Sequence, residues 1–193
     1  MRPMEILAFI AVIAAIAIAV GTGFWLRARQ ERRSVRLREG FGPEYERAVE
    51  EYGDKSRAER ELAARERRVQ KLSVRLLTPQ ERDRFGSAWS GVQQRFVDDP
   101  NGAVAEADRL VKSVMATRGY PIDDFEQRIA DLSVDHARVV QHYRAARILA
   151  QANAAGSSTT EDLRQAMVHY RVLFADLLES YTPPWHEPHE VRA

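Results

Sequence analysis

The chain begins with its most hydrophobic segment. From Ile6 to Leu26, 21 consecutive residues carry no charge, and 11 of them are Leu, Ile, Val or Phe. As an α-helix this stretch would be ~31 Å long, which matches the ~30 Å hydrocarbon layer of a bilayer. Phe24 and Trp25 stand near its end, where aromatic rings favour the membrane interface. The pattern therefore predicts an N-terminal transmembrane helix.

A charged helical pattern follows over residues 39–77. Gly40 to Pro43 should break the first helix, since glycine and proline disfavour its continuation. About half of the residues from Glu44 to Leu72 are charged. Apolar and small residues recur there at alternating intervals of four and three, with Arg65 in the same stripe. We interpret 39–77 as a charged helical spacer, either a solvated stalk or a self-associating helix, that ends in an extended connector at 73–77.

Residues 78–181 carry the clearest amphipathic helical patterns. Start signals stand at Thr78-Pro79 with Glu81, at Asp99-Pro100, at Asp123-Asp124, and at Ser158 with Glu161. Gly119 is a stop signal. The expected core positions share helical spacing: Phe85, Trp89, Val92, Phe96, Val104, Ala107, Val111, Val114, Met115, Phe125, Ile129, Leu132, Val139, Val140, Tyr143, Ala146, Ala150, Leu163, Met167, Tyr170, Phe174, Leu177, Leu178 and Tyr181.

These patterns predict an all-α protein. We expect a membrane anchor with a basic collar at 1–38, the spacer at 39–77, and an antiparallel helical bundle of about five helices at 78–181. The last residues, 182–193, should form a disordered tail, because disorder concentrates at chain termini.

The charges are distributed unevenly along the chain. Residues 27–38 carry a net +5 and contain Glu31 as their only acidic residue. The whole chain carries +1 and residues 1–26 are neutral, so residues 39–193 carry a net −4. A mildly acidic domain argues against nucleic acid as a partner, since phosphate binding needs concentrated Lys and Arg. The candidate membrane-interface residues are the six arginines of this segment, Arg27, Arg29, Arg32, Arg33, Arg36 and Arg38. They would either contact anionic lipid headgroups or only determine the orientation of the membrane helix.

The position of these arginines also predicts the orientation. Because arginine-rich flanks stay in the cytoplasm, we expect the N-terminus outside and the helical domain in the cytoplasm. The alternative is a cleaved signal peptide, since Ala15-Ile16-Ala17 and Ala17-Ile18-Ala19 have the form that a signal peptidase accepts. A signal peptide carries its positive charge in front of the hydrophobic segment, which favours the uncleaved anchor here.

Few residues indicate chemistry. The chain has no cysteine, which excludes disulfides, thiolate metal sites and cysteine nucleophiles. The segment His186 to Glu190 is rich in potential metal ligands, but it lacks a helical histidine pair and contains a proline, so we expect a solvated tail. His142 and His169 flank the core positions Tyr143 and Tyr170 on helices expected to be neighbours. A facing pair with a carboxylate could make a site, but boundary histidines are the simpler interpretation.

The acidic residues are best explained as helix caps. We expect Asp135 to cap a helix that starts at His136, and Asp98-Asp99, Asp123-Asp124 and Asp131 to lie at helix termini. The chain contains no glycine-rich phosphate loop, serine elbow or HExxH motif. We therefore predict no catalytic, cofactor or metal residues.

Four segments resemble an uncharacterised bacterial family. They are Phe41-Gly42-Pro43-Glu44-Tyr45, Arg95-Phe96-Val97-Asp98-Asp99-Pro100, Asp131-Leu132-Ser133-Val134-Asp135-His136 and Thr160-Glu161-Asp162-Leu163-Arg164. Family members pair one N-terminal hydrophobic segment with a helical domain. The resemblance spans nearly everything after the hydrophobic segment and implies this architecture, without an activity.

The sequence as a whole favours a non-enzymatic interaction or scaffold module at the bacterial inner membrane. Its expected partners are the lipid bilayer and either another protein or a second copy of the chain. Two alternatives stay open. One is an exported helical domain, released or tethered outside. The other is an enzyme or small-ligand binder with a pocket between bundle helices near His142, His169 or Tyr143.

Overall fold

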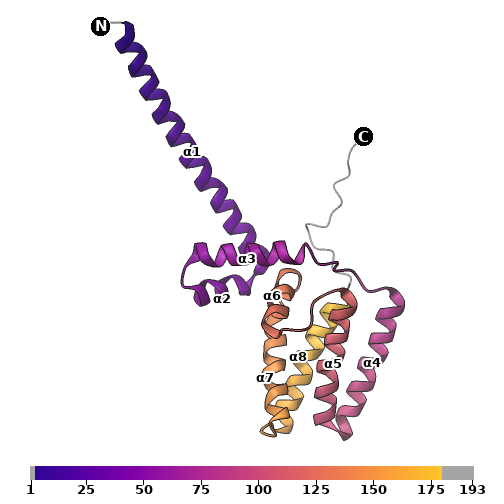
Figure 1. Cartoon of the computed structure of the whole chain (residues 1–193). Helices are drawn as coiled ribbons and strands as arrows, with labels where there is room; N and C mark the ends of the chain where they lie inside the picture. The colour runs from indigo at the N-terminus through magenta and orange to yellow at the C-terminus, as the bar shows by residue number, and fades with distance from the viewer. Residues whose placement is uncertain (1–2, 180–193) are drawn as a thin grey trace. The chain divides into compact units, whose positions relative to one another are not determined.

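The computed structural model describes residues 3–179, without the side chains of residues 3–19 and Leu26. Within that range the chain forms eight α-helices and no strand (Figure 1), which confirms the all-α prediction. The helices are α1 (Pro3–Phe41), α2 (Pro43–Tyr52), α3 (Lys55–Val69), α4 (Pro79–Asp98), α5 (Pro100–Arg118), α6 (Phe125–Asp135), α7 (Val140–Ala154) and α8 (Thr160–Leu178). They belong to two compact units, 1–40 and 41–193.

Helix α1 contains the predicted membrane span. Among the residues that are described, no helix is both long enough and apolar enough to cross a bilayer. Most of the predicted span, 6–26, falls outside that set, because the side chains of residues 6–19 and Leu26 are not described. The predicted break is confirmed. Gly42 has a φ of 48°, and Pro43 takes a first-turn position of α2.

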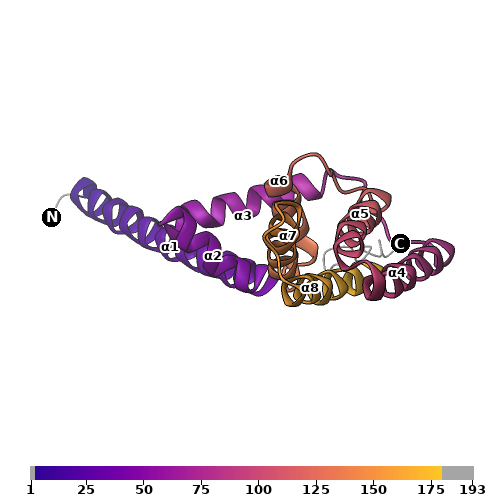
Figure 2. The ribbon, with the colours of Figure 1, turned by 90° about the horizontal axis from the view of Figure 1, so that it is seen from below.

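Helices α2 and α3 form a hairpin whose packing differs from both expectations for the spacer. The stripe that includes Leu62 and Arg65 is buried, with exposures of 0% and 8%. Helix α3 packs against α2 and against α6, which it crosses (Figures 1 and 2). Within the hairpin, the Tyr45 hydroxyl donates to Glu59 Oε1 at 2.8 Å. The stripe is therefore not solvated, and it is not exposed for pairing with a second copy, because it is buried where α3 packs against α2 and α6.

Five helices, α4 to α8, occupy the predicted bundle region. Helices α7, α8, α5 and α4 stand side by side in that order (Figure 1), and successive members of this row contact each other. Their shared core includes the stacked rings of Trp89 and Phe174, whose centroids are 4.7 Å apart. Most core positions expected from the sequence are buried there, including Phe85, Val92, Val111, Met115, Leu132, Tyr143, Leu163 and Tyr170. Four expected positions are only partly buried, namely Phe96, Phe125, Ala150 and Leu178, and Tyr181 lies outside the described residues.

Most of the predicted helix boundaries are confirmed at the level of single hydrogen bonds. Thr78 and Glu81 form the expected capping box, and the Asp99 and Asp124 side chains cap α5 and α6. Gly119 ends α5 with a φ of 95°. Helix α4 therefore begins where its sequence signal stands.

Three predicted caps are wrong. The box of α8 forms between Thr159 and Asp162 rather than between Ser158 and Glu161, since the Glu161 carboxylate binds Arg164. Asp135 does not cap α7. It is the last residue of α6, and its carboxylate accepts a 2.6 Å hydrogen bond from Tyr120.

Asp131 is the third exception. It lies inside α6, nine-tenths or more buried, where Arg68 and Gln127 donate to its Oδ1 atom at 2.7 and 2.8 Å. A buried carboxylate with such partners joins helices instead of neutralising a helix end.

Candidate functional site

Arg118 and His136 form a polar cluster in the interior of the bundle. Arg118 is 3% exposed, and its Nη1 atom lies 3.1 Å from His136 Nε2 and 3.1 Å from the Leu177 carbonyl oxygen. On the other side of the ring, His136 Nδ1 hydrogen-bonds to Asp176. A guanidinium can only donate, so Nε2 accepts and Nδ1 carries the proton toward Asp176. Both ring nitrogens are thus engaged, and His136 ties helix ends together without a free base.

A second polar cluster surrounds Asp108 at the α5–α8 contact. Asp108 accepts from the Tyr170 hydroxyl at 3.0 Å and from Lys112 Nζ at 2.6 Å. Desolvation, followed by the charge of Asp108, raises the pKa of Tyr170, so this hydroxyl stays protonated at neutral pH. Tyr143, which is fully buried, accepts from Arg128 at 2.7 Å. These hydrogen bonds connect α5 with α8 and α6 with α7.

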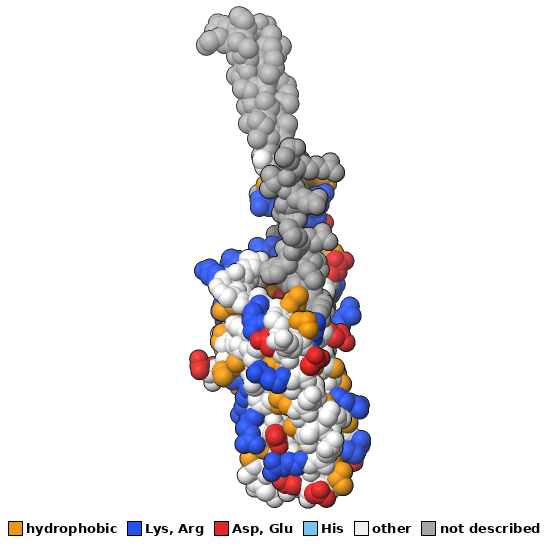
Figure 3. Space-filling view, turned by 90° about the vertical axis from the view of Figure 1, so that its right-hand side faces the viewer, with side chains coloured by type: hydrophobic (Ala, Val, Ile, Leu, Met, Phe, Trp, Pro, Cys, Tyr) orange, Lys and Arg blue, Asp and Glu red, His pale blue; other side chains and the backbone are white. Residues whose placement is uncertain are grey.

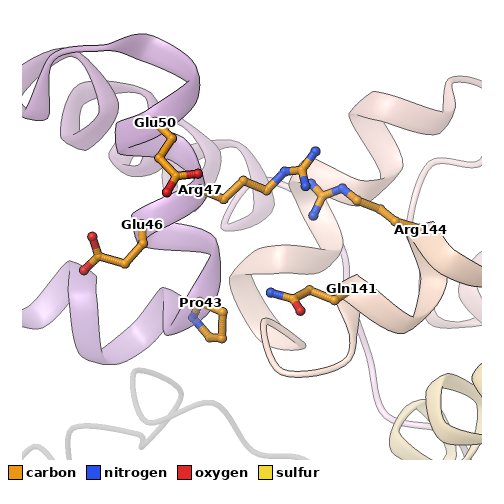
Figure 4. Close-up of a pocket in the computed structure, with 6 residues that line it drawn as sticks. All are labelled: Pro43, Glu46, Arg47, Glu50, Gln141 and Arg144. Carbon is orange, nitrogen blue, oxygen red and sulfur yellow. The ribbon is translucent and has the colours of Figure 1, made fainter.

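A groove between α2 and α7 is visible in Figure 4. Arg47 and Arg144 point toward each other across it, and Glu46, Glu50, Gln141 and Pro43 complete a cavity of about 390 Å³. Arg144 is held by the buried Glu44, with Nη1 2.5 Å from Oε1. Two arginines and two glutamates line the groove, so their formal charges cancel. This balance gives the groove no net attraction for an anionic ligand.

A second groove, between α4 and α8, has a different composition. Its floor consists of the buried or half-buried side chains Trp89, Phe96 and Met167, and the exposed Arg171 lies at its edge. The cavity has a volume of about 160 Å³, and its other lining residues are Gln93, Arg164 and Val168. Next to Phe96, Val97 is 81% exposed on α4. Aromatic residues, methionine and arginine are enriched at the centres of protein interfaces. This α4–α8 groove is the candidate interaction site.

The electrostatics of this groove depend mainly on Arg171. Arg164 is committed to Glu161, through bonds of 2.8 and 2.7 Å. Arg171 is exposed, and no carboxylate among the described residues forms an ion pair with it. On the face that Figure 3 shows, Lys/Arg and Asp/Glu side chains are intermixed with small hydrophobic patches. The groove therefore combines an apolar floor with a cation that is available to a ligand.

His142 and His169 do face each other, on α7 and α8. Their Nδ1 atoms are 2.9 Å apart, and both side chains are half-buried. The sequence placed the pair on neighbouring helices, and the structure brings the rings into contact. No carboxylate completes a three-ligand metal site with the pair, since the described residues contain no group of three or more His, Asp or Glu side chains able to hold a metal.

The predicted membrane-interface arginines lie on α1. All six arginines of 27–38 are exposed, and the Arg29 guanidinium lies 5.4 Å from the centre of the Trp25 ring. The ligand-rich segment 186–190 and the predicted disordered tail lie outside the described residues.

The sequence missed the α4–α8 groove and the contacts of Arg118. The groove joins side chains from the two ends of the bundle sequence, and Arg118 bonds to a carbonyl 59 positions away. Local periodicity reports which side of a helix is apolar, but it does not report which other helix covers it. The sequence offers one signal for these contacts, because Arg118 is the basic residue in the last turn of α5. A basic residue at that position indicates only the end of a helix.

Comparisons with known proteins add no assignment. No protein-family model matches the chain, and no curated protein and no solved structure matches it. The resemblance to a bacterial family therefore stays a prediction, and the function has to be argued from the residues themselves.

Proposed function

We propose that this chain is a single-pass membrane-anchored helical protein whose domain is a non-enzymatic interaction module at the cytoplasmic side of the bacterial inner membrane. The anchor is supported by the 21 uncharged residues of 6–26. The exposed arginines that follow directly support the orientation, because such residues are retained in the cytoplasm and are attracted to anionic headgroups.

The α4–α8 groove is the observation that carries the interaction function. Its aromatic and thioether floor would receive an apolar side chain, and Arg171 would pair with a carboxylate beside it. The partner is accordingly a protein segment in which an apolar or aromatic residue stands next to Asp or Glu. The interior supports a non-enzymatic role, because its polar groups are hydrogen-bonded to one another. His136 bonds to Arg118 and Asp176. Tyr170 donates to Asp108.

Peptide selection tests the groove. The full chain, held in nanodiscs, is used to select from a random peptide display library, and we expect enrichment of peptides with an apolar residue beside Asp or Glu. The charge reversal Arg171→Glu should abolish binding of these peptides. Arg109→Glu, which reverses another exposed arginine on α5, is the matched control and should leave binding unchanged. Equal peptide binding by the Arg171 and Arg109 variants would show that the α4–α8 groove is not the binding site.

Topology is tested separately. Fusion of a phosphatase that is active only outside the cytoplasm to the C-terminus should give an inactive reporter, and the chain should resist extraction from membranes by alkaline carbonate. Strong phosphatase activity in a chain that retains residues 1–26 would overturn the orientation. N-terminal sequencing that shows their loss would favour the exported alternative.

The ligand-binding alternative has less support. The groove on the α7 side is lined by Gln141 and Arg144 rather than by His142 or Tyr143. Tyr143 is 0% exposed and packs edge-on against Phe125, with ring centroids 5.3 Å apart. A substrate pocket at this tyrosine would need the core to open.

A further inference from the structure

His142 and His169 form a ligand pair that neither the fold nor the proposed interaction explains. We propose that these two side chains bind a late first-row divalent transition-metal ion, such as Zn²⁺, at the surface between α7 and α8. The proposal is independent of membrane anchoring and of the α4–α8 groove.

The distance between the two ring nitrogens fits a shared ion. The Nδ1 atoms are 2.9 Å apart, and the rings are inclined at 46° with centroids 5.2 Å apart. Metal–imidazole bonds are about 2.0–2.1 Å long, so two such bonds separate their nitrogens by about 2.9 Å at a right angle and about 3.3 Å at a tetrahedral angle. The observed separation of the two nitrogens is thus within a few tenths of an ångström of the one that a shared ion requires.

The backbone on both sides of the pair is fixed. Each histidine is followed in sequence by a fully buried tyrosine, Tyr143 on α7 and Tyr170 on α8, and each of these hydroxyls is hydrogen-bonded. The histidine Cα positions are therefore set by the core, and only the side chains would move on binding. Ligands held in advance lose less conformational freedom when the ion arrives.

The ligand type also favours this class of ion. With no carboxylate completing a three-ligand group among the described residues, the pair provides nitrogen only. Imidazole suits Zn²⁺, Ni²⁺ and Cu²⁺, whereas Mg²⁺ and Ca²⁺ require oxygen. Water would fill the remaining positions, because both rings are half-exposed.

Without metal, the same geometry is an N–H···N hydrogen bond in which one ring donates. Metal binding would replace this proton by the ion, so protons and Zn²⁺ compete for one site. A pair that serves only as a hydrogen bond would bind no metal, and the two roles are distinguished by titration.

Calorimetry with ZnCl₂ tests the site on the full chain in detergent, prepared without a histidine tag. We expect one saturable binding event per chain and no heat with MgCl₂. His142→Gln and His169→Gln should each weaken zinc binding by about tenfold or more, a loss of about 1.4 kcal/mol. Since the chain has five histidines, the double variant His186→Gln with His189→Gln is the matched control and should bind zinc as the unaltered chain does. Zinc binding that survives in the His142 and His169 variants, or that disappears in the control, would overturn the proposal.

Thermal unfolding provides a second measurement that also checks folding. A ligand that binds the folded chain raises Tm by mass action. Zinc should raise the Tm of the unaltered chain and of the His186/His189 variant, and at the same zinc concentration it should raise the Tm of His142→Gln by less. The circular dichroism spectrum of each variant shows whether it is folded. A zinc-induced rise of equal size in His142→Gln would contradict the assignment.

Discussion

Arg68 of α3 and Asp131 of α6 form an ion pair in which the two partners differ sharply in burial. Arg68 Nε lies 2.7 Å from Asp131 Oδ1, and the side chains are 37% and 1% exposed. The second oxygen, Oδ2, is buried without a hydrogen-bond partner in the structure. The carboxylate therefore depends on Arg68 and Gln127, and this contact attaches the α2–α3 hairpin to the bundle.

Removal of Arg68 should destabilise the fold because it leaves a buried charge unpaired. We expect Arg68→Gln to lower the free energy of unfolding by about 3 kcal/mol, as measured by urea denaturation. Arg67→Gln changes an exposed neighbour on the same helix and should alter it by about 0.5 kcal/mol or less. Similar losses in both variants would show that the ion pair is not the cause.

Gly119 should resist substitution for two physical reasons. Its φ is +95°, and an added Cβ would lie 2.6 Å from the Ser73 carbonyl oxygen. Gly119→Ala should therefore lower the free energy of unfolding by about 2 kcal/mol. Gly86 lies inside α4, where an added Cβ would meet open space, so Gly86→Ala should instead stabilise by about 0.5–1 kcal/mol. Chemical denaturation of the two variants gives opposite signs if this reasoning holds.

The start of α4 should contain an unusually acidic carboxyl group. Hydrogen bonds from Arg75 and then from the Thr78 backbone lower the pKa of Glu81 to about 2. Its stabilising contribution is therefore complete above pH 4.5 and is lost as the pH falls toward 2. NMR titration of the side-chain carboxyl carbon measures this pKa directly. In Arg75→Gln it should move toward 4.5, and an unchanged pKa would contradict the assigned cause.

The histidine pair should make the fold sensitive to mild acid. The pKa of His169 is lowered by burial and then by His142, so the unfolded chain binds a proton more readily than the folded one. The free energy of unfolding should be constant above pH 6.5 and should fall as the pH decreases from 6.5 through the folded-state pKa. Denaturation curves in metal-free buffer between about pH 5 and 7.5 measure this dependence. In His169→Gln the loss over this interval should be smaller.

Helix-end signals explain why the sequence predicted the fold well. Thr78, Asp99, Asp124 and Gly119 act within three or four residues, so their consequences can be derived locally. One error arose where two adjacent candidates competed, whereas Asp131 and Asp135 are bound by other side chains instead of capping a helix. Thr159 outcompeted Ser158 as the cap of α8, and no local rule decides between neighbours of similar capping strength.

Tertiary contacts explain what the sequence did not predict. Arg65 made its helix stripe look solvated, yet this side chain is only 8% exposed. A long arginine can bury its stem at a helix interface, so charge alone does not predict exposure. The contact between His142 and His169 was foreseen as one option, but its 2.9 Å spacing depends on how α7 and α8 pack.

Arg118 has a consequence for how the bundle opens. Besides its bonds to His136 and Leu177, Arg118 donates to the Arg75 carbonyl at 3.3 Å, and the Arg75 amide donates back to the Arg118 carbonyl at 2.8 Å. One guanidinium thus links the connector before α4 to the ends of α5, α6 and α8. We therefore expect fraying at this end to be cooperative, because one residue contacts all of these segments. The amide protons of Arg75 and His136 should exchange with solvent deuterium in a single shared opening event.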